Sequence, residues 1–110
     1  MSSLLIMQDP KQAEYIQLLW NRLREQNTKA MAASRRWEER SGQLLDRAHA
    51  KGWDVGPDGP DRWQYTEMRE KDLELTDAMA AWSWHEREAK RCAAAITAAY
   101  HARRLLGLIP

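Results

Sequence analysis

Apolar residues recur at alternating spacings of three and four along two long stretches of this chain. In the first stretch the series is Ile16, Trp20, Leu23, Asn27, Ala30, Ser34, Trp37, Ser41, Leu44 and Ala48. In the second it is Tyr65, Met68, Asp72, Leu75, Met79, Trp82, Glu86, Ala89, Ala93, Ile96 and Tyr100. A heptad pattern that persists over several turns is typical of helices that pair along a seam. The pattern therefore predicts two long helices.

Capping and helix-breaking residues bound these two helices. The stretch Asp9-Pro10-Lys11-Gln12 is a good helix start, because Asp9 can cap free N–H groups and proline suits the first helical position. Glycine and proline then cluster between Lys51 and Pro60, and Gly52 stands where a left-handed C-terminal cap is expected. We predict a first helix over about 10–51, a connector over 52–59 and a second, uninterrupted helix over about 60–106.

Two helices of similar length with one tight connector predict an all-α fold, an antiparallel two-helix hairpin that resembles a coiled coil. We expect it to form a single domain over residues 1–110. With the turn centred near residue 56, residues whose numbers sum to about 112 face each other. Asn27 then faces His85 and Glu86, which predicts a buried polar layer that fixes the register of the seam.

The chain has more apolar surface than one hairpin seam can bury. Trp82 and Trp84 are two positions apart, about 200° around a helix, so they face different partners. Trp84 shares a second stripe with Leu73 and several alanines. An exposed apolar stripe of this length indicates an interface, and we expect two hairpins to form a homodimeric four-helix bundle. The expected interface residues on the helices are Trp20, Trp37, Leu73, Trp82 and Trp84.

A hairpin also brings the two ends of the chain together. The apolar residues that meet there are Leu4, Leu5, Ile6, Leu105, Leu106, Leu108 and Ile109. Two interpretations remain open. The tails can fold over the open end of the bundle and cap it, or they can form a docking patch for another protein.

Charge argues against nucleic acid as the principal partner. The net charge is +1, and strong sequence-independent binding to nucleic acid requires many unopposed cations. A local excess of positive charge does occur late in the chain, at Arg87, Lys90, Arg91, Arg103 and Arg104. A nucleic-acid-binding accessory factor that uses this part of the second helix is therefore kept as an alternative.

Composition points to a cytoplasmic location. The single Cys92 excludes an internal disulfide, and the opening residues lack the basic region of a signal peptide. No stretch approaches the roughly 20 apolar residues that span a bilayer, so we expect no membrane partner. The absence of phenylalanine and the excess of arginine over lysine are typical of a GC-rich bacterial or bacteriophage gene.

No residue cluster indicates catalysis. His85, Glu88 and Cys92 share a helix face at spacings suited to a metal, but no second cluster offers matching ligands. His85 is two turns from Cys92, too far to activate the thiol by a hydrogen bond. The connector glycines follow no strand and precede no Gly-Lys-Ser/Thr sequence. We therefore expect no enzyme activity, no metal and no cofactor.

The size, the hairpin and the Trp/Gly connector resemble the small Trp-x-Gly hairpin proteins of type VII secretion. The resemblance is architectural, because Trp53-Asp54-Val55-Gly56 has one residue too many for that motif. Four residues after Tyr100 stands Arg104, where the export signal of that family has an acidic residue. Membership would imply a secreted heterodimer.

The features together predict a non-catalytic interaction or regulatory protein. We expect it to self-associate and to bind a second, unidentified protein through its apolar helix faces or its termini. The secreted hairpin partner and the nucleic-acid-binding factor are the alternatives.

Overall fold

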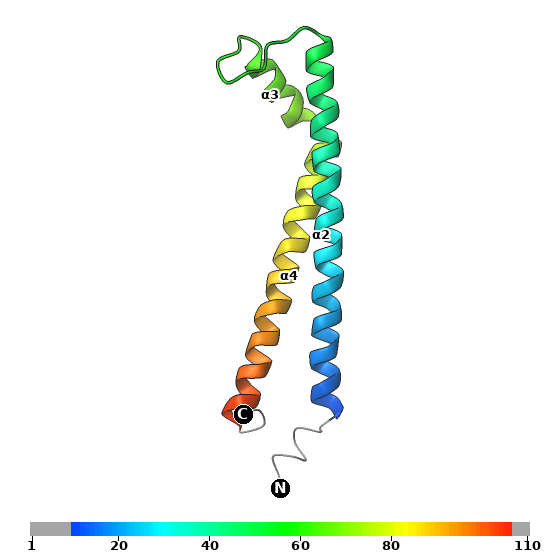
Figure 1. Cartoon of the computed structure of the whole chain (residues 1–110), viewed down its shortest axis with the longest axis vertical. Coiled ribbons are helices and arrows are strands. Elements are labelled where there is room, and N and C mark those ends of the chain that lie inside the picture. Colours follow the sequence, from blue (N-terminus) through cyan, green and yellow to red (C-terminus); the bar gives the residue numbers. More distant parts are fainter. Residues whose placement is uncertain (1–9, 107–110) are drawn as a thin grey trace. The chain divides into compact units, whose positions relative to one another are not determined.

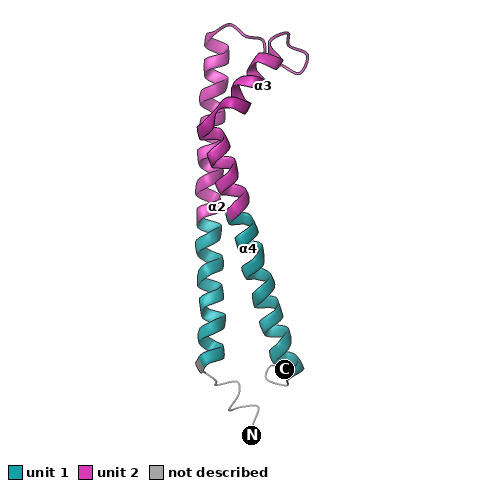
Figure 2. Ribbon diagram, turned by 180° about the vertical axis from the view of Figure 1, so that it is seen from behind, with its two compact units in different colours: residues 1–28, 85–110 teal, residues 29–84 magenta. Residues whose placement is uncertain are grey.

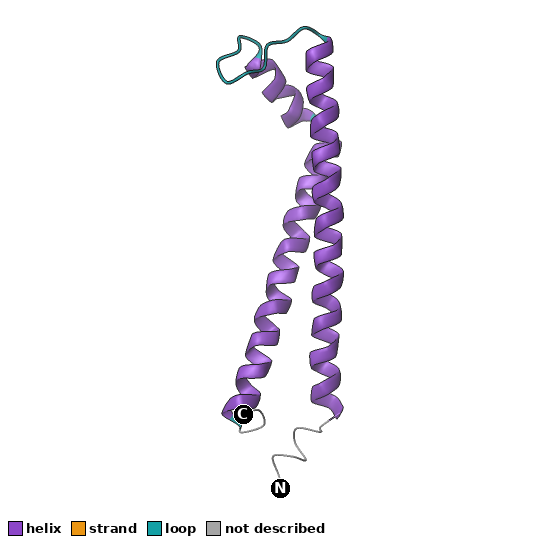
Figure 3. Cartoon of the chain, in the orientation of Figure 1, coloured by secondary structure: helices purple, strands orange, loops and turns teal. Residues whose placement is uncertain are grey.

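A computed structural model describes residues 10–106 of the chain. Within this range it contains three helices and no strand: α2 (Pro10–Ala50), α3 (Arg62–Lys71) and α4 (Leu73–Leu105) (Figure 1, Figure 3). The chain divides into two compact units, residues 1–28 with 85–110 and residues 29–84 (Figure 2). The long helices α2 and α4 contribute to both units. The predicted all-α fold is confirmed.

Contacts inside the 29–84 unit give the direction of the helices. The Trp37 and Trp82 rings lie 6.2 Å apart, and Arg40 pairs with Asp72. Later residues of α2 thus meet earlier residues of α4, which is the antiparallel arrangement of a hairpin. The pairing of Arg40 with Asp72 matches the predicted register.

The end of α2 is set by Gly52, as predicted. Gly52 has a φ of 75°, a left-handed conformation that glycine adopts without a side-chain clash. Its N–H donates to the His49 carbonyl at 2.9 Å, and the Trp53 N–H donates to the Ala48 carbonyl at 3.0 Å. These two bonds form a Schellman motif, which satisfies carbonyls that the helix end leaves without a partner.

Replacement by alanine is expected to have opposite effects on stability at Gly52, which caps α2, and at Gly42, which lies inside α2. Gly52→Ala forces a Cβ into the left-handed region and is expected to destabilise the fold by about 1–2 kcal/mol. Gly42→Ala lies inside α2 with nothing within 4 Å of the new Cβ, and is expected to stabilise it by about 0.5–1 kcal/mol. Urea denaturation followed by circular dichroism measures both. Equal signs would contradict the cap assignment.

Small residues make up more than half of the described core. The buried apolar residues are Ile16, Ala89, Cys92 and Ile96 in one unit, and Ala30, Ala33, Leu44, Ala48, Leu75 and Ala78 in the other. Leu44 is the only large side chain among the described residues with less than 2% of its surface exposed. Alanine lets helices approach closely, but it removes little apolar surface from water. The core is therefore thin.

The second helix is not continuous, so the prediction of one helix over 60–106 is wrong. It begins at Arg62 and is divided at Asp72, whose ψ of 114° is extended. Asp72 acts as the N-cap of α4, because its Oδ2 accepts the Leu75 N–H at 2.9 Å. The seam pattern runs through Asp72 without a glycine or proline, so spacing alone gave no sign of the break.

The predicted polar layer of Asn27, His85 and Glu86 is also wrong in its partners. Asn27 and Glu86 are exposed, whereas His85 is half-buried. His85 Nδ1 lies 2.6 Å from Oε1 of Gln26, one position before the predicted partner. The longer glutamine side chain reaches across from the edge of the seam, so a polar contact exists there with a different α2 residue.

Candidate interaction surfaces

The Asp72 carboxylate at the elbow between α3 and α4 is held by Arg40 of α2, which also lies 3.4 Å from Oε2 of Glu74. Arg40 donates from Nε to Oδ2 of Asp72 at 2.9 Å and from Nη2 to Oδ1 at 2.6 Å. The two side chains are 13% and 11% exposed. Such a two-bond fork between guanidinium and carboxylate fixes orientation as well as charge. Arg40 also donates to Gln43 Oε1 at 2.9 Å, so its own position is supported from α2.

This fork keeps Asp72 ionised. The hydrogen bonds from Arg40 lower the pKa of the Asp72 carboxyl from 3.8 to about 2, and the Leu75 N–H acts in the same direction. A carboxyl with a lowered pKa stabilises the fold above its ordinary pKa, and this contribution is lost as the pH falls towards the folded value. At any pH near neutrality the pair is therefore permanently charged.

A second set of contacts attaches α3 to the hairpin. The Arg69 guanidinium lies 5.5 Å from the centre of the Trp37 ring and 5.6 Å from that of Tyr65. Arg69 also donates to the Tyr65 hydroxyl at 3.2 Å. Trp37 in turn packs on Trp82 with an angle of 55° between the rings. Residues from α3, α2 and α4 thus form one continuous row of aromatic and cationic groups.

The bend leaves an apolar groove, the elbow groove, of about 500 Å³. It is lined by Trp37, Arg69, Glu70, Leu75, Thr76, Met79 and Ala80. Met79 is 41% exposed, and the side chains of Leu75 and Trp37 lie deeper. The residue numbers of Trp37 and Leu75 sum to 112, so the predicted register places them opposite each other, and both line this groove. A concave apolar surface with a cation and a carboxylate at its edge suits an apolar side chain.

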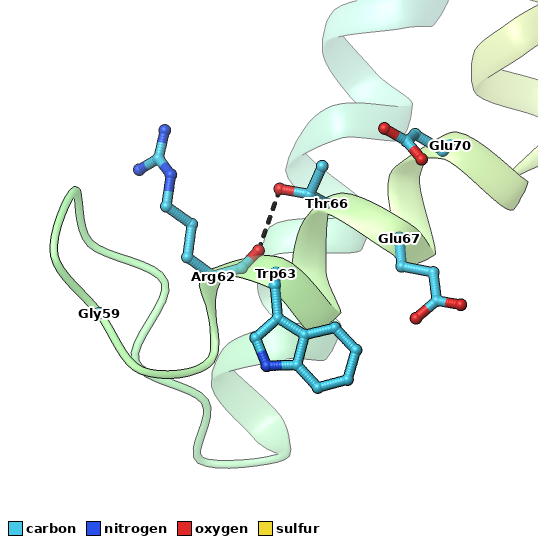
Figure 4. A pocket seen from close by; sticks show the side chains of 6 residues that line it. All are labelled: Gly59, Arg62, Trp63, Thr66, Glu67 and Glu70. Atoms are coloured by element: carbon cyan, nitrogen blue, oxygen red, sulfur yellow. Dashed lines mark hydrogen bonds between the residues drawn. The ribbon is translucent and has the colours of Figure 1, made fainter.

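The outer face of α3 carries a second hollow of about 700 Å³, lined by Gly59, Arg62, Trp63, Thr66, Glu67 and Glu70. Trp63 is 65% exposed, and Figure 4 shows its indole on the same side of α3 as Glu67. Glu67 accepts a hydrogen bond from Lys71 at 2.7 Å, an ion pair between positions four apart on α3.

The unit that contains the ends of α2 and α4 has a smaller groove of about 180 Å³. Its lining residues are Gln12, Tyr15, Ile16, Ala99, Ala102, Arg103 and Leu106. Tyr15 and Leu106 are 53% and 68% exposed, and the Gln12 Oε1 atom is buried without a hydrogen-bond partner. Leu106, one residue of the predicted terminal patch, lines this groove.

The structure separates the predicted interface residues into two sets. Trp37 and Trp82 are half-buried against each other inside one unit. The exposed set, with the exposed fraction of each, is Trp20 (41%), Leu73 (77%), Trp84 (53%), Leu105 (75%) and Leu106 (68%). The remaining predicted residues, Leu4, Leu5, Ile6, Leu108 and Ile109, lie outside the described residues. The different surroundings of Trp82 and Trp84 agree with their predicted separation around the helix.

The side chains that could bind a metal or act as a nucleophile do not form a cluster among the described residues. In the part of the chain that the structure describes, no three His, Cys, Asp or Glu side chains lie close enough to hold a metal ion. Cys92 is buried, with 5% of its surface exposed. Of the helices between residues 10 and 106, none combines the length and hydrophobicity of a membrane-spanning segment.

Sequence reasoning missed the residues that shape the elbow. Arg40 and Arg69 lie outside the heptad series and read as ordinary surface cations of charged helices. The partner of Arg40, Asp72, is 32 residues away in the sequence, and the partner of Arg69, Trp37, lies on another helix. The one local signal was Asp72 itself, a capping residue type followed by Leu73 and Glu74.

No protein-family model, curated protein or solved structure matches this chain.

Proposed function

We propose that the chain is a non-catalytic helical interaction protein that self-associates through exposed apolar faces and binds another protein. The observation that supports this is the distribution of large apolar side chains. Among the described residues eleven of them are 39–77% exposed, whereas only Ile16, Leu44, Leu75 and Ile96 are buried. Six of the ten core residues are alanine or cysteine. A chain that leaves so much apolar surface in water gains by covering it.

The outer stripe of α4, formed by Leu73, Ala80 and Trp84, is the face best suited to a second copy. All three residues are exposed, and they share one side of α4 because positions eleven apart differ by only about 20° around a helix. Ala80 lies between the two large side chains and allows close helix approach. Trp84 supplies an aromatic anchor of the kind that dominates interfaces.

The test is light scattering coupled to size-exclusion chromatography over a micromolar dilution series. The parent chain is expected near twice 12.8 kDa. Leu73→Ser with Trp84→Ser is expected to shift the mass to that of one chain, because both anchors of the stripe are removed. Circular dichroism confirms that the variant is helical.

Trp63→Ser is the matched control. Trp63 is 65% exposed, more than Trp84, but lies on α3 away from the stripe. This variant is expected to keep the parent mass. A parent chain that stays monomeric at every concentration would contradict self-association and would assign the exposed faces to a different protein. Equal masses for the control and the double variant would contradict the choice of stripe.

A further inference from the structure

Nothing in the local sequence requires the second helix to break at Asp72. The surrounding residues Glu70-Lys71-Asp72-Leu73-Glu74 contain no glycine or proline, and the seam spacing continues from Met68 to Leu75. Leucine, lysine and glutamate favour helix, and aspartate costs only a fraction of a kcal/mol in a helix interior, roughly 0.7 at most. The break therefore rests on the cap that Asp72 itself provides and on a contact from elsewhere in the chain that holds its carboxylate in place.

Those contacts come from polar groups rather than from a core. α3 contains no buried residue. The Arg69 guanidinium of α3 lies over the Trp37 ring of α2, and Asp72 at the end of α3 is fixed by Arg40. An element held by a few polar contacts opens at lower free energy than one packed in a core. The position of α3 thus depends in part on Arg69 and on the Arg40–Asp72 pair.

The Asp72 carboxylate can cap α4 only in the broken form. Its Oδ2 accepts the Leu75 N–H, and the same oxygen accepts from Arg40 Nε. In a continuous helix the Leu75 N–H would bond to the carbonyl four residues earlier, at Lys71. The cap would then be lost. The fork from Arg40 holds the carboxylate in the position that the cap needs.

We propose that the elbow is a two-state conformational device in which the Arg40–Asp72 pair holds residues 62–105 as two helices. Loss of the pair lets α3 and α4 join into one continuous helix. The elbow groove exists only in the bent form, because a straight helix has no concave angle between Arg69–Glu70 and Met79–Ala80.

Spin-label distances distinguish the two forms. Labels at Arg62→Cys and Ser83→Cys, both exposed, are placed in the full chain with Cys92→Ala. Their Cα atoms would lie about 32 Å apart in one continuous helix and closer in the bent form. The labelled chain is diluted with an excess of unlabelled chain, so that two labelled copies rarely meet. The measured distances then lie within one chain, whether or not the chain self-associates. The parent is expected to give the shorter distance alone.

Asp72→Ala and Arg40→Gln are each expected to show a distance near 32 Å, either beside the shorter one or in place of it. Lys71→Ala is the control, because it removes only the exposed pair with Glu67 beside the break, and it is expected to show the same distance as the parent. Circular dichroism confirms helix content. If Asp72→Ala fails to fold, Arg40→Gln decides the outcome, because it keeps the carboxylate that caps Leu75. A short distance unchanged in Arg40→Gln would overturn the proposal, as would an equal lengthening in Lys71→Ala.

Discussion

Replacing Leu44 by alanine is expected to destabilise the chain by about 2–5 kcal/mol, the range for truncating a buried leucine. Leu44 has 1% of its surface exposed and is the only large side chain of the described core buried to that degree. Ala48, one turn further along α2, is also buried and has no longer side chain that could move into the space. The cavity therefore stays largely unfilled.

A loss of that size is a large part of the 5–15 kcal/mol by which domains are typically stable. Urea denaturation followed by circular dichroism at 222 nm measures it. Leu18→Ala is the control, since Leu18 is also on α2 but 65% exposed. The control is expected to change the free energy of unfolding by no more than about 0.5 kcal/mol. Similar losses in both variants would contradict the assignment of Leu44 to the core.

Periodicity was sufficient to predict the parts of the fold that depend on apolar spacing. The start and length of α2, the left-handed cap at Gly52 and the antiparallel direction of α4 all follow from the positions of apolar residues, glycine and proline. These features are local, or result from the burial of a whole stripe. No single long-range contact decides them.

The elbow could not be predicted in the same way, because two unlike effects compete at Asp72. Helix propensity and the seam pattern favour continuation, whereas a side-chain cap and an ion pair across the hairpin favour a break. The balance depends on whether Arg40 lies within reach of the carboxylate. Spacing predicts the level at which the two residues meet but not the geometry of the side chains.

The predicted polar partner of His85 was wrong for a related reason. The seam spacing identified the right level of the hairpin but selected Asn27, whose position belongs to the heptad series. The observed partner, Gln26, stands one position outside it, and its longer side chain brings Oε1 to 2.6 Å from His85. Heptad positions describe apolar packing well, whereas long polar side chains reach the seam from its flanks.

Trp37→Ala is expected to have the second large effect on stability, a loss of about 2–4 kcal/mol. The half-buried Trp37 ring contacts Trp82 on α4 and carries the Arg69 guanidinium of α3 on its face. Its removal leaves a space between α2 and α4 and also removes the aromatic surface that holds α3. Urea denaturation followed by circular dichroism measures the loss, and Trp63→Ala is the control because Trp63 is 65% exposed.

A double-mutant cycle separates the two contacts of Trp37. Tilted aromatic pairs contribute about 0.5–1.5 kcal/mol beyond burial, so Trp37→Ala and Trp82→Ala are expected to couple by that amount. Trp37→Ala and Arg69→Met are expected to couple by about 0.5–1 kcal/mol or somewhat more, because the half-buried Arg69 guanidinium lies over the ring. Additive losses in both cycles would mean that Trp37 acts only by filling space. Coupling in both means that one tryptophan connects all three helices, and its loss then weakens the elbow as well as the hairpin.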